Sequence, residues 1–171
     1  MSLRTTKGIG RWVIVWLFCM LFCSSSESLF GVTAGKGGSV KSKLQKMYLD
    51  HLKEEGFKAE VDEDGDVRFK REGKTYFISI DEKDPLFFRV VLPNFWEIEN
   101  DDERIKVLRS ADWANGRTKS CKIFSVRNNL WASVDIFLPK LEEFKAVMSR
   151  CFSVLDTGVQ NFVERMGEKS E

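Results

Sequence analysis

The chain has 171 residues, with 27 basic and 26 acidic side chains and a formal net charge of +1 at pH 7. This length is sufficient for a single domain whose apolar core needs no metal ion or disulfide to be stable. The balanced charge argues against the dense basic surface that is typical of nucleic-acid-binding proteins.

The amino-terminal segment has the composition of a secretory signal. Arg4, Lys7 and Arg11 precede the unbroken apolar run 12–22, and the serine cluster 24–26 follows it. Secretory signals show this order of charged, apolar and small residues. At about 1.5 Å per residue the apolar run is too short for a stable transmembrane helix. We expect export to the periplasm or envelope with residues 1–26 as signal peptide, the alternatives being an uncleaved membrane anchor and a buried helix.

Cys23 indicates a second way in which the amino terminus could be processed, because bacterial lipoprotein signals end at a cysteine that becomes lipidated. The residue before that cysteine is usually small, whereas Phe22 is bulky, so the match is poor. Lipidation of Cys23 would anchor the protein in the membrane through its acyl chains. Residues 27–39 are rich in glycine and small side chains, which predicts a flexible tether. Without residues 1–26 the chain keeps 24 basic and 26 acidic residues, as expected of an ordinary soluble surface.

The first predicted element of the domain is a helix over residues 40–55. Ser39 is placed to cap it and Gly56 to end it. Apolar residues recur every three or four positions and so share one side that must be buried, namely Val40, Leu44, Met47, Tyr48 and Leu52.

Four short strands are predicted next, over residues 57–62, 66–70, 75–80 and 86–92. Apolar and polar residues alternate along each of them, which is the period of a half-buried strand. The turns between them are the acidic stretch 62–66, the pair Glu72 and Gly73, and the stretch 81–85. Turns this short favour an antiparallel meander. Pro93 is expected to end the fourth strand.

The remaining elements are a helix over 100–115, a hairpin and a long helix. Asn100 is expected to cap the first of these helices, with Ile105, Leu108 and Trp113 as its apolar positions and Gly116 at its end. The hairpin pairs 119–127 with 130–138 through a turn at Asn128 and Asn129. The long helix follows Pro139 as far as residue 166, with Gly158 as a weak point that could bend it, at about 1 kcal/mol relative to alanine. One α+β domain over 40–167 results, with a disordered tail at 168–171.

The two faces of the predicted antiparallel sheet differ in character. One is uniformly apolar, and we expect the first and last helices to cover it: Phe57, Ala59, Val61, Val67, Phe69, Tyr76, Ile78, Ile80, Leu86, Phe88, Val90, Leu130, Ala132, Val134 and Ile136. On the other face five large apolar residues alternate with polar ones: Phe77, Phe87, Val91, Trp131 and Phe137. Either the second helix or the end of the third covers these five, or they form an exposed patch for a partner or a second copy.

The motifs that would indicate an enzyme are missing from the sequence. Asp62, Asp64 and Asp66 begin like a calcium loop, but the sixth position holds Val67 and the twelfth Gly73, where an EF-hand needs glycine and glutamate. His51 is the only histidine, and we expect it to serve packing or the surface. Phosphate-binding, zinc-protease and nucleophile-elbow motifs are absent. We expect a protein that is not an enzyme and needs no cofactor, the rival being an unrecognised site around residues 62–66.

Two cysteines lie within the predicted domain, Cys121 and Cys151. Both fall in apolar patterns, so we expect buried thiols, with a disulfide between them as the alternative in an oxidising compartment.

Residues 44–166 resemble the YbjN-domain family of bacterial sensory transduction regulators. The similarity is carried by residues 56–80 (GFKAEVDEDGDVRFKREGKTYFISI), 111–124 (ADWANGRTKSCKIF) and 138–152 (LPKLEEFKAVMSRCF). The resemblance implies a fold like that of type III secretion chaperones, in the order α-ββββ-α-ββ-α, and a module without enzymatic activity that dimerises or holds a peptide. It implies no catalytic or ligand residues. An export signal departs from the cytoplasmic members, which argues against a chaperone role inside the cell.

Together these observations predict an exported binding or regulatory module. We expect it to engage a protein partner or itself through the mixed sheet face, without nucleic acid, and to touch the membrane only through the signal segment or a lipidated Cys23. A structural envelope lipoprotein is the alternative function.

Overall fold

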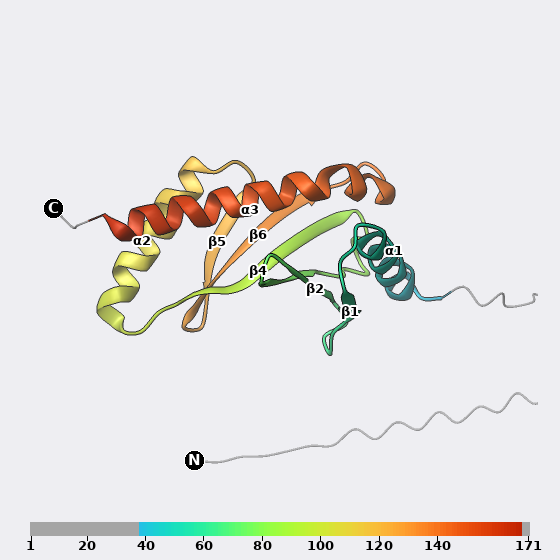
Figure 1. Ribbon diagram of the computed structural model, residues 1–171, viewed down its shortest axis with the longest axis horizontal. Coiled ribbons are helices and arrows are strands. Elements are labelled where there is room, and N and C mark those ends of the chain that lie inside the picture. The colour runs from blue at the N-terminus through green and yellow to red at the C-terminus, as the bar shows by residue number, and fades with distance from the viewer. Residues whose placement is uncertain (1–37, 169–171) are drawn as a thin grey trace, which may run out of the picture. The chain divides into compact units, whose positions relative to one another are not determined.

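The computed structural model describes residues 38–168. The expected signal peptide, Cys23, most of the tether and the last three residues lie outside the described residues. The elements run in the order α1 (Val40–Glu54), β1 (Ala59–Val61), β2 (Val67–Arg71), β3 (Lys74–Ile78), β4 (Phe87–Glu97), α2 (Asp101–Arg117), β5 (Cys121–Val126), β6 (Asn129–Phe137), the short 3-10 helix η1 (Leu141–Glu143) and α3 (Phe144–Gly167) (Figure 1). The predicted α+β class and element order are confirmed.

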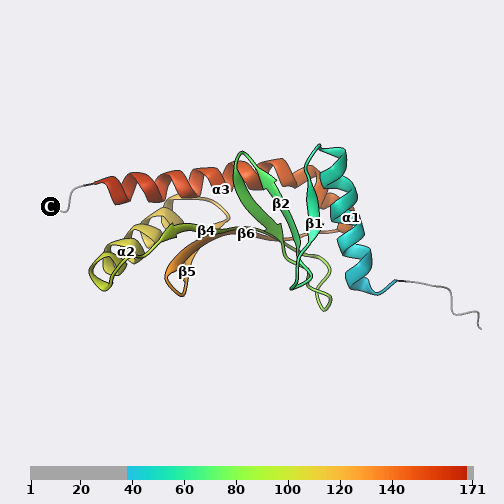
Figure 2. The same ribbon diagram turned by 60° about the horizontal axis from the view of Figure 1, so that its bottom comes forward.

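The strands form one antiparallel sheet in the order β1-β2-β3-β4-β6-β5. Helix α3 packs along β4, β5 and β6, whereas α1 packs against β1 and β2 (Figure 2). Helix α2 contacts α3 and β5, so its buried residues join the same core. The prediction that the first and last helices cover the apolar face is therefore confirmed.

Side-chain caps begin the first two helices, α1 and α2, where expected. The Ser39 hydroxyl accepts a hydrogen bond from the Ser42 N–H at 3.2 Å, and the Asn100 carboxamide accepts one from the Glu103 N–H at 2.9 Å. Each cap satisfies an N–H group that has no partner within its helix. Glu103 also accepts from the Glu99 N–H at 2.7 Å, which completes the start of α2.

Strand β4 does not end at Pro93, which corrects one prediction. It continues to Glu97 through a register shift between Leu92 and Trp96, and Asn94 in this bulge has φ of +50°. Proline is tolerated at a bulge because the ladder needs no N–H from it there. The bulge shifts the pairing register, and the strand continues beyond it.

Other boundaries also differ from the predictions. Helix α2 runs through Gly116 to Arg117, and the β5–β6 turn consists of Arg127, with φ of +56°, and Asn128. By contrast, the predicted turn at Glu72 and Gly73 is confirmed, with both residues at positive φ. Five residues expected on buried sides are between 40% and 57% exposed: Val40, Val61, Leu86, Ile105 and Leu108.

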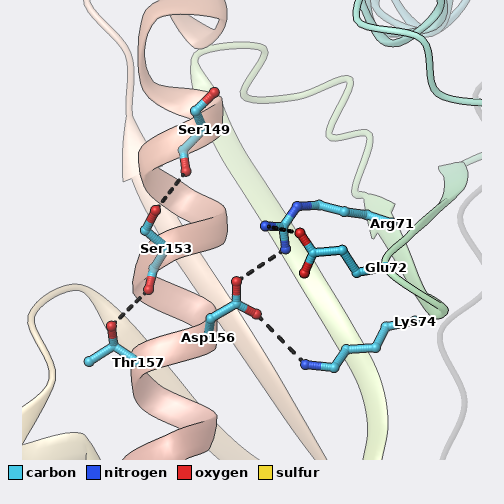
Figure 3. A network of polar contacts seen from close by, with 7 residues as sticks. All are labelled: Arg71, Glu72, Lys74, Ser149, Ser153, Asp156 and Thr157. Atoms are coloured by element: carbon cyan, nitrogen blue, oxygen red, sulfur yellow. Dashed lines mark hydrogen bonds and ion pairs between the residues drawn. The ribbon is translucent and has the colours of Figure 1, made fainter.

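Arg71 fastens the β2–β3 hairpin to α3 (Figure 3). Its Nη1 donates to Asp156 Oδ2 at 3.1 Å, its Nη2 lies 2.9 Å from Glu72 Oε1, and its guanidinium lies 5.0 Å from the centre of the Phe152 ring. Lys74 Nζ adds a contact at 3.7 Å to the other oxygen of Asp156. These interactions hold the hairpin in a fixed position on the core.

Cys121 and Cys151 are free, buried thiols, so the disulfide alternative is wrong. Burial raises the pKa of each thiol to about 11, which keeps both protonated at neutral pH.

Gly158 allows α3 to lie close to β5, and α3 is continuous through it. A Cβ at this position would lie 2.5 Å from Cys121 Sγ and 3.2 Å from Cys121 Cβ. Glycine is therefore required by packing rather than being only a weak point of the helix.

We expect Gly158→Ala to lower the free energy of unfolding by up to about 2 kcal/mol. Overpacking costs about 1–3 kcal/mol, and the better helix propensity of alanine offsets about 1 kcal/mol of that cost. Urea unfolding of this variant and of Gly158→Ala combined with Cys121→Ala would test the contact. The double variant removes the sulfur, so the Gly158→Ala penalty should shrink; an equal penalty in both backgrounds would contradict it.

Candidate functional site

The sheet face opposite the helices is the candidate site. We call it the open face, and it carries Arg68, Lys70, Phe77, Ser79, Phe87, Arg89, Val91, Lys122, Phe124, Trp131, Ser133, Asp135 and Phe137. All five predicted interaction candidates lie on it. None of the helices between residues 38 and 168 packs across it, so the alternative that α2 or the end of α3 covers these residues is wrong.

Exposure differs strongly among the five candidates. Phe137 is 78% exposed, whereas Phe77, Phe87 and Trp131 are half-buried. Val91 is only 2% exposed although it lies outside the core cluster. Side chains of the open face itself must therefore cover Val91, which makes it part of the floor of the site.

The centre of the open face holds a compact ion cluster. The strand register places Arg89 of β4 opposite Asp135 of β6. Arg89 donates to both oxygens of Asp135, from Nε at 2.9 Å and from Nη2 at 2.8 Å, and Lys122 Nζ donates at 2.6 Å. Two parallel bonds from a guanidinium to a carboxylate form the strongest class of protein hydrogen bond.

The cluster shifts the pKa of Asp135. Burial alone would raise this pKa, but the hydrogen bonds from Arg89 and Lys122 together outweigh burial and lower it to about 2. Asp135 is therefore ionised throughout the neutral range. Arg89 and Lys122 also lie over aromatic rings, with 4.9 Å from the guanidinium carbon to the centre of Phe87 and 5.4 Å from Nζ to the centre of Phe124.

Aromatic residues on either side of the ion cluster form two groups. Trp131 lies edge-on to Phe77, with ring centres 5.7 Å apart, and 6.4 Å from Phe124. Phe87 and Phe137 form a separate pair at 5.4 Å. The Trp131 indole N–H donates to Asn94 Oδ1 at 2.8 Å, so the β4 bulge fixes the orientation of the indole.

A pocket of about 370 Å³ opens at the first aromatic group. It is lined by Asp62, Asp64, Asp66, Phe77, Ser79, Arg89, Val91, Phe124 and Trp131. The pocket thus joins the acidic β1–β2 turn to the aromatic part of the open face.

Hydrogen bonds within the acidic turn hold its backbone in place. Asp62 Oδ1 accepts from the N–H groups of Asp64 at 3.1 Å and of Asp66 at 3.0 Å. Asp66 Oδ1 accepts from the N–H of Ile80 at 2.8 Å, which ties the turn to the end of β3. The turn is therefore anchored at both ends.

Helix α1 supports the same turn from its other side. Gln45 Nε2 donates to the Gly65 carbonyl at 2.8 Å, and Lys41 Nζ donates to the Asp64 carbonyl at 3.4 Å. Gly65 has φ of +89°, a backbone conformation that residues with a side chain rarely adopt, so glycine is favoured there. The acidic wall of the pocket is held in position before any ligand binds.

Neither a metal centre nor a membrane span is found in the part of the chain that the structure describes. No group of three histidine, cysteine or acidic side chains between residues 38 and 168 is arranged to hold a metal ion. Over the same residues, no helix combines the length and the apolar character that crossing a bilayer requires. His51 is buried beside Phe144, with ring centres 5.1 Å apart, so it contributes to packing.

Sequence reasoning missed Phe124 and Lys122 as parts of the site, and it considered the acidic turn only as a separate, rival site. The alternation of Cys121 and Ile123 with Lys122 and Phe124 could have assigned the first two to the open face. The sequence carries no local signal that the acidic turn borders this face.

A scan against protein-family models finds no match, and a search of curated proteins finds no similar sequence. The resemblance to the YbjN-domain family therefore stays a prediction.

Proposed function

We propose that this chain is an exported binding module, without enzymatic activity, that engages a polypeptide partner or a second copy of itself through the open face. The observation that carries the proposal is the set of large apolar side chains on a sheet face that none of the described helices covers. A sheet that packs its other face on the core normally presents polar residues to water. Contiguous exposed apolar surface usually marks a binding site.

The polar groups of the open face favour binding over chemistry. Arg89 and Lys122 are engaged by Asp135, and Asp135 is ionised, so this cluster offers no proton donor or acceptor near neutral pH. An ion cluster surrounded by aromatic residues is instead well suited to orient a partner, because charge complementarity fixes register.

Export belongs to the proposal because of the order of charged, apolar and small residues over 4–26. The YbjN-like identity also belongs to it, supported by the element order that the resemblance implies. Mass spectrometry of the mature amino terminus tests export. A terminus near Glu27 is expected, whereas an intact Met1 would exclude cleavage and a diacylated Cys23 would favour the lipoprotein alternative.

Photo-crosslinking in the native host tests the binding surface. A benzophenone amino acid at Phe137, the most exposed aromatic of the open face, should give a discrete adduct with a partner or with a second copy. The matched control is the same amino acid at Ile105, which is 57% exposed but lies on α2. Trp131→Asp should remove the adduct at 137. Equal adducts at both positions, or none at 137, would refute the proposed surface.

A further inference from the structure

The pocket at the acidic turn has an unbalanced charge. Three acidic residues line it, Asp62, Asp64 and Asp66, against one basic residue, Arg89. Arg89 already makes two hydrogen bonds to Asp135, so little of its charge is available to the pocket. In the described contacts the Asp64 carboxylate accepts no hydrogen bond, and its backbone alone is engaged. The pocket therefore presents negative charge to a ligand.

The opposite wall of the pocket also favours a cation. Phe77, Phe124 and Trp131 are aromatic, and the face of an aromatic ring carries partial negative charge; the Phe124 ring already has Lys122 Nζ 5.4 Å from its centre. Aromatic rings next to carboxylates attract cations, most strongly where water is partly excluded.

The environment of Asp66 also favours a positively charged ligand. Burial raises its pKa and the hydrogen bond from the Ile80 N–H lowers it; the charges of Asp62 and Asp64 raise it further, and the charge of Lys41 opposes them. A cation in the pocket would relieve this repulsion. Gln45 of α1 holds the backbone of the turn and the Ile80 N–H holds the Asp66 carboxylate, so these parts of the pocket wall are fixed in place.

We propose that this pocket receives an arginine side chain of the polypeptide partner, and this inference rests on the proposed function. A planar guanidinium can lie flat on the Trp131 indole while it donates hydrogen bonds to a carboxylate. The apolar stem of arginine matches the Val91 floor and the Phe77 wall. A volume of about 370 Å³ is large enough for one long side chain and lies at the small end of the range of ligand pockets.

Two synthetic peptides test the inference on the full chain. One is acetyl-Ala-Val-Arg-Val-Ala-amide, and the other replaces arginine with citrulline, which is isosteric and uncharged. The reporter is the indole N–H resonance of Trp131 in nitrogen-15 spectra, assigned with Trp131→Phe. We expect saturable shifts with a Kd of about 1 mM or tighter for the arginine peptide, and binding at least about tenfold weaker for the citrulline peptide.

Two variants of the acidic turn provide the matched comparison. Asp64→Asn removes a lining charge whose side chain makes no described hydrogen bond, and it should weaken binding of the arginine peptide about tenfold. Glu63→Gln removes the same charge from the neighbouring residue, which does not line the pocket, and should leave binding within about twofold.

Three outcomes would overturn the inference. Equal affinity for the two peptides would mean that the pocket does not recognise charge. Absence of any saturable shift would mean that the pocket is not a peptide site. Methylguanidinium binding as tightly as the arginine peptide would assign the pocket to a small molecule. Crosslinking at position 137 could persist in each case, so the proposed function would stand while this inference failed.

Discussion

Replacing Asn115 with alanine is expected to lower the free energy of unfolding by about 2–4 kcal/mol. The Asn115 side chain of α2 lies at the outer edge of β5 and forms hydrogen bonds with both backbone groups of Ile123. Its Nδ2 donates to the Ile123 carbonyl at 3.0 Å, and its Oδ1 accepts from the Ile123 N–H at 2.7 Å. The carboxamide thus substitutes for a neighbouring strand at the sheet edge.

The magnitude follows from what alanine leaves behind. Ile123 is 4% exposed, so both of its backbone groups would lose a partner in a place that water reaches poorly. Each buried unsatisfied group costs about 1–3 kcal/mol. The same loss would expose a template for strand pairing, because unpaired edge groups invite another chain.

Urea unfolding measures the first effect and sedimentation velocity the second. The control is Asp112→Ala, an exposed position one turn earlier in α2, which should change stability by less than about 0.5 kcal/mol. An Asn115→Ala variant as stable as the control would show that the Ile123 groups find other partners. A variant that is less stable but remains as monomeric as the wild type would restrict Asn115 to a role in stability.

Local signals in the sequence were sufficient to predict most of the architecture. Ser39 and Asn100 cap their helices through their own side chains, and Gly73 supplies the positive φ that the two-residue turn with Glu72 needs. Strand alternation assigned Phe77, Trp131 and Phe137 to a common face. These features depend on neighbours in the chain, so a sequence pattern contains them.

The errors arise where distant segments decide the outcome. Pro93 is compatible with strand β4 only because a bulge places it where no ladder hydrogen bond is needed. Gly158 is required by Cys121, which is remote in sequence. Val61 is the last residue of β1 and Leu86 lies in the turn before β4, and both remain about 40% exposed.

The same distinction applies to the candidate site. Alternation predicts which side of a strand a residue occupies, but not whether a helix covers that side. The sequence therefore left open whether the mixed face is covered or exposed. The pocket needs the acidic turn to meet Phe124 of β5, although three strands, β3, β4 and β6, lie between β5 and the hairpin that carries the turn. No local sequence pattern predicts that the acidic turn and Phe124 line the same pocket.

The second large effect is a loss of stability in acid that originates at Asp135. Its pKa is about 2 in the folded protein, against an ordinary value of 3.8. A carboxyl group with a lowered pKa stabilises the fold above its unfolded pKa and loses this contribution as pH falls through the folded value. Because each pKa unit corresponds to about 1.36 kcal/mol, we expect a loss of about 2 kcal/mol, beginning near pH 4 and complete below about pH 2.

Comparison with Asp135→Asn isolates this contribution from those of the other carboxyl groups. The variant keeps the shape of the side chain but has no charge and does not titrate. Its free energy of unfolding should therefore differ most from that of the wild type near neutral pH, where Asp135 is ionised. That difference should shrink by about 2 kcal/mol as pH falls from about 5 to 2, measured by urea unfolding at each pH. Asp112→Asn, at an exposed position, should show no such convergence. Parallel stability curves for the wild type and Asp135→Asn would mean that Arg89 and Lys122 do not hold this carboxylate in solution as they do in the structure.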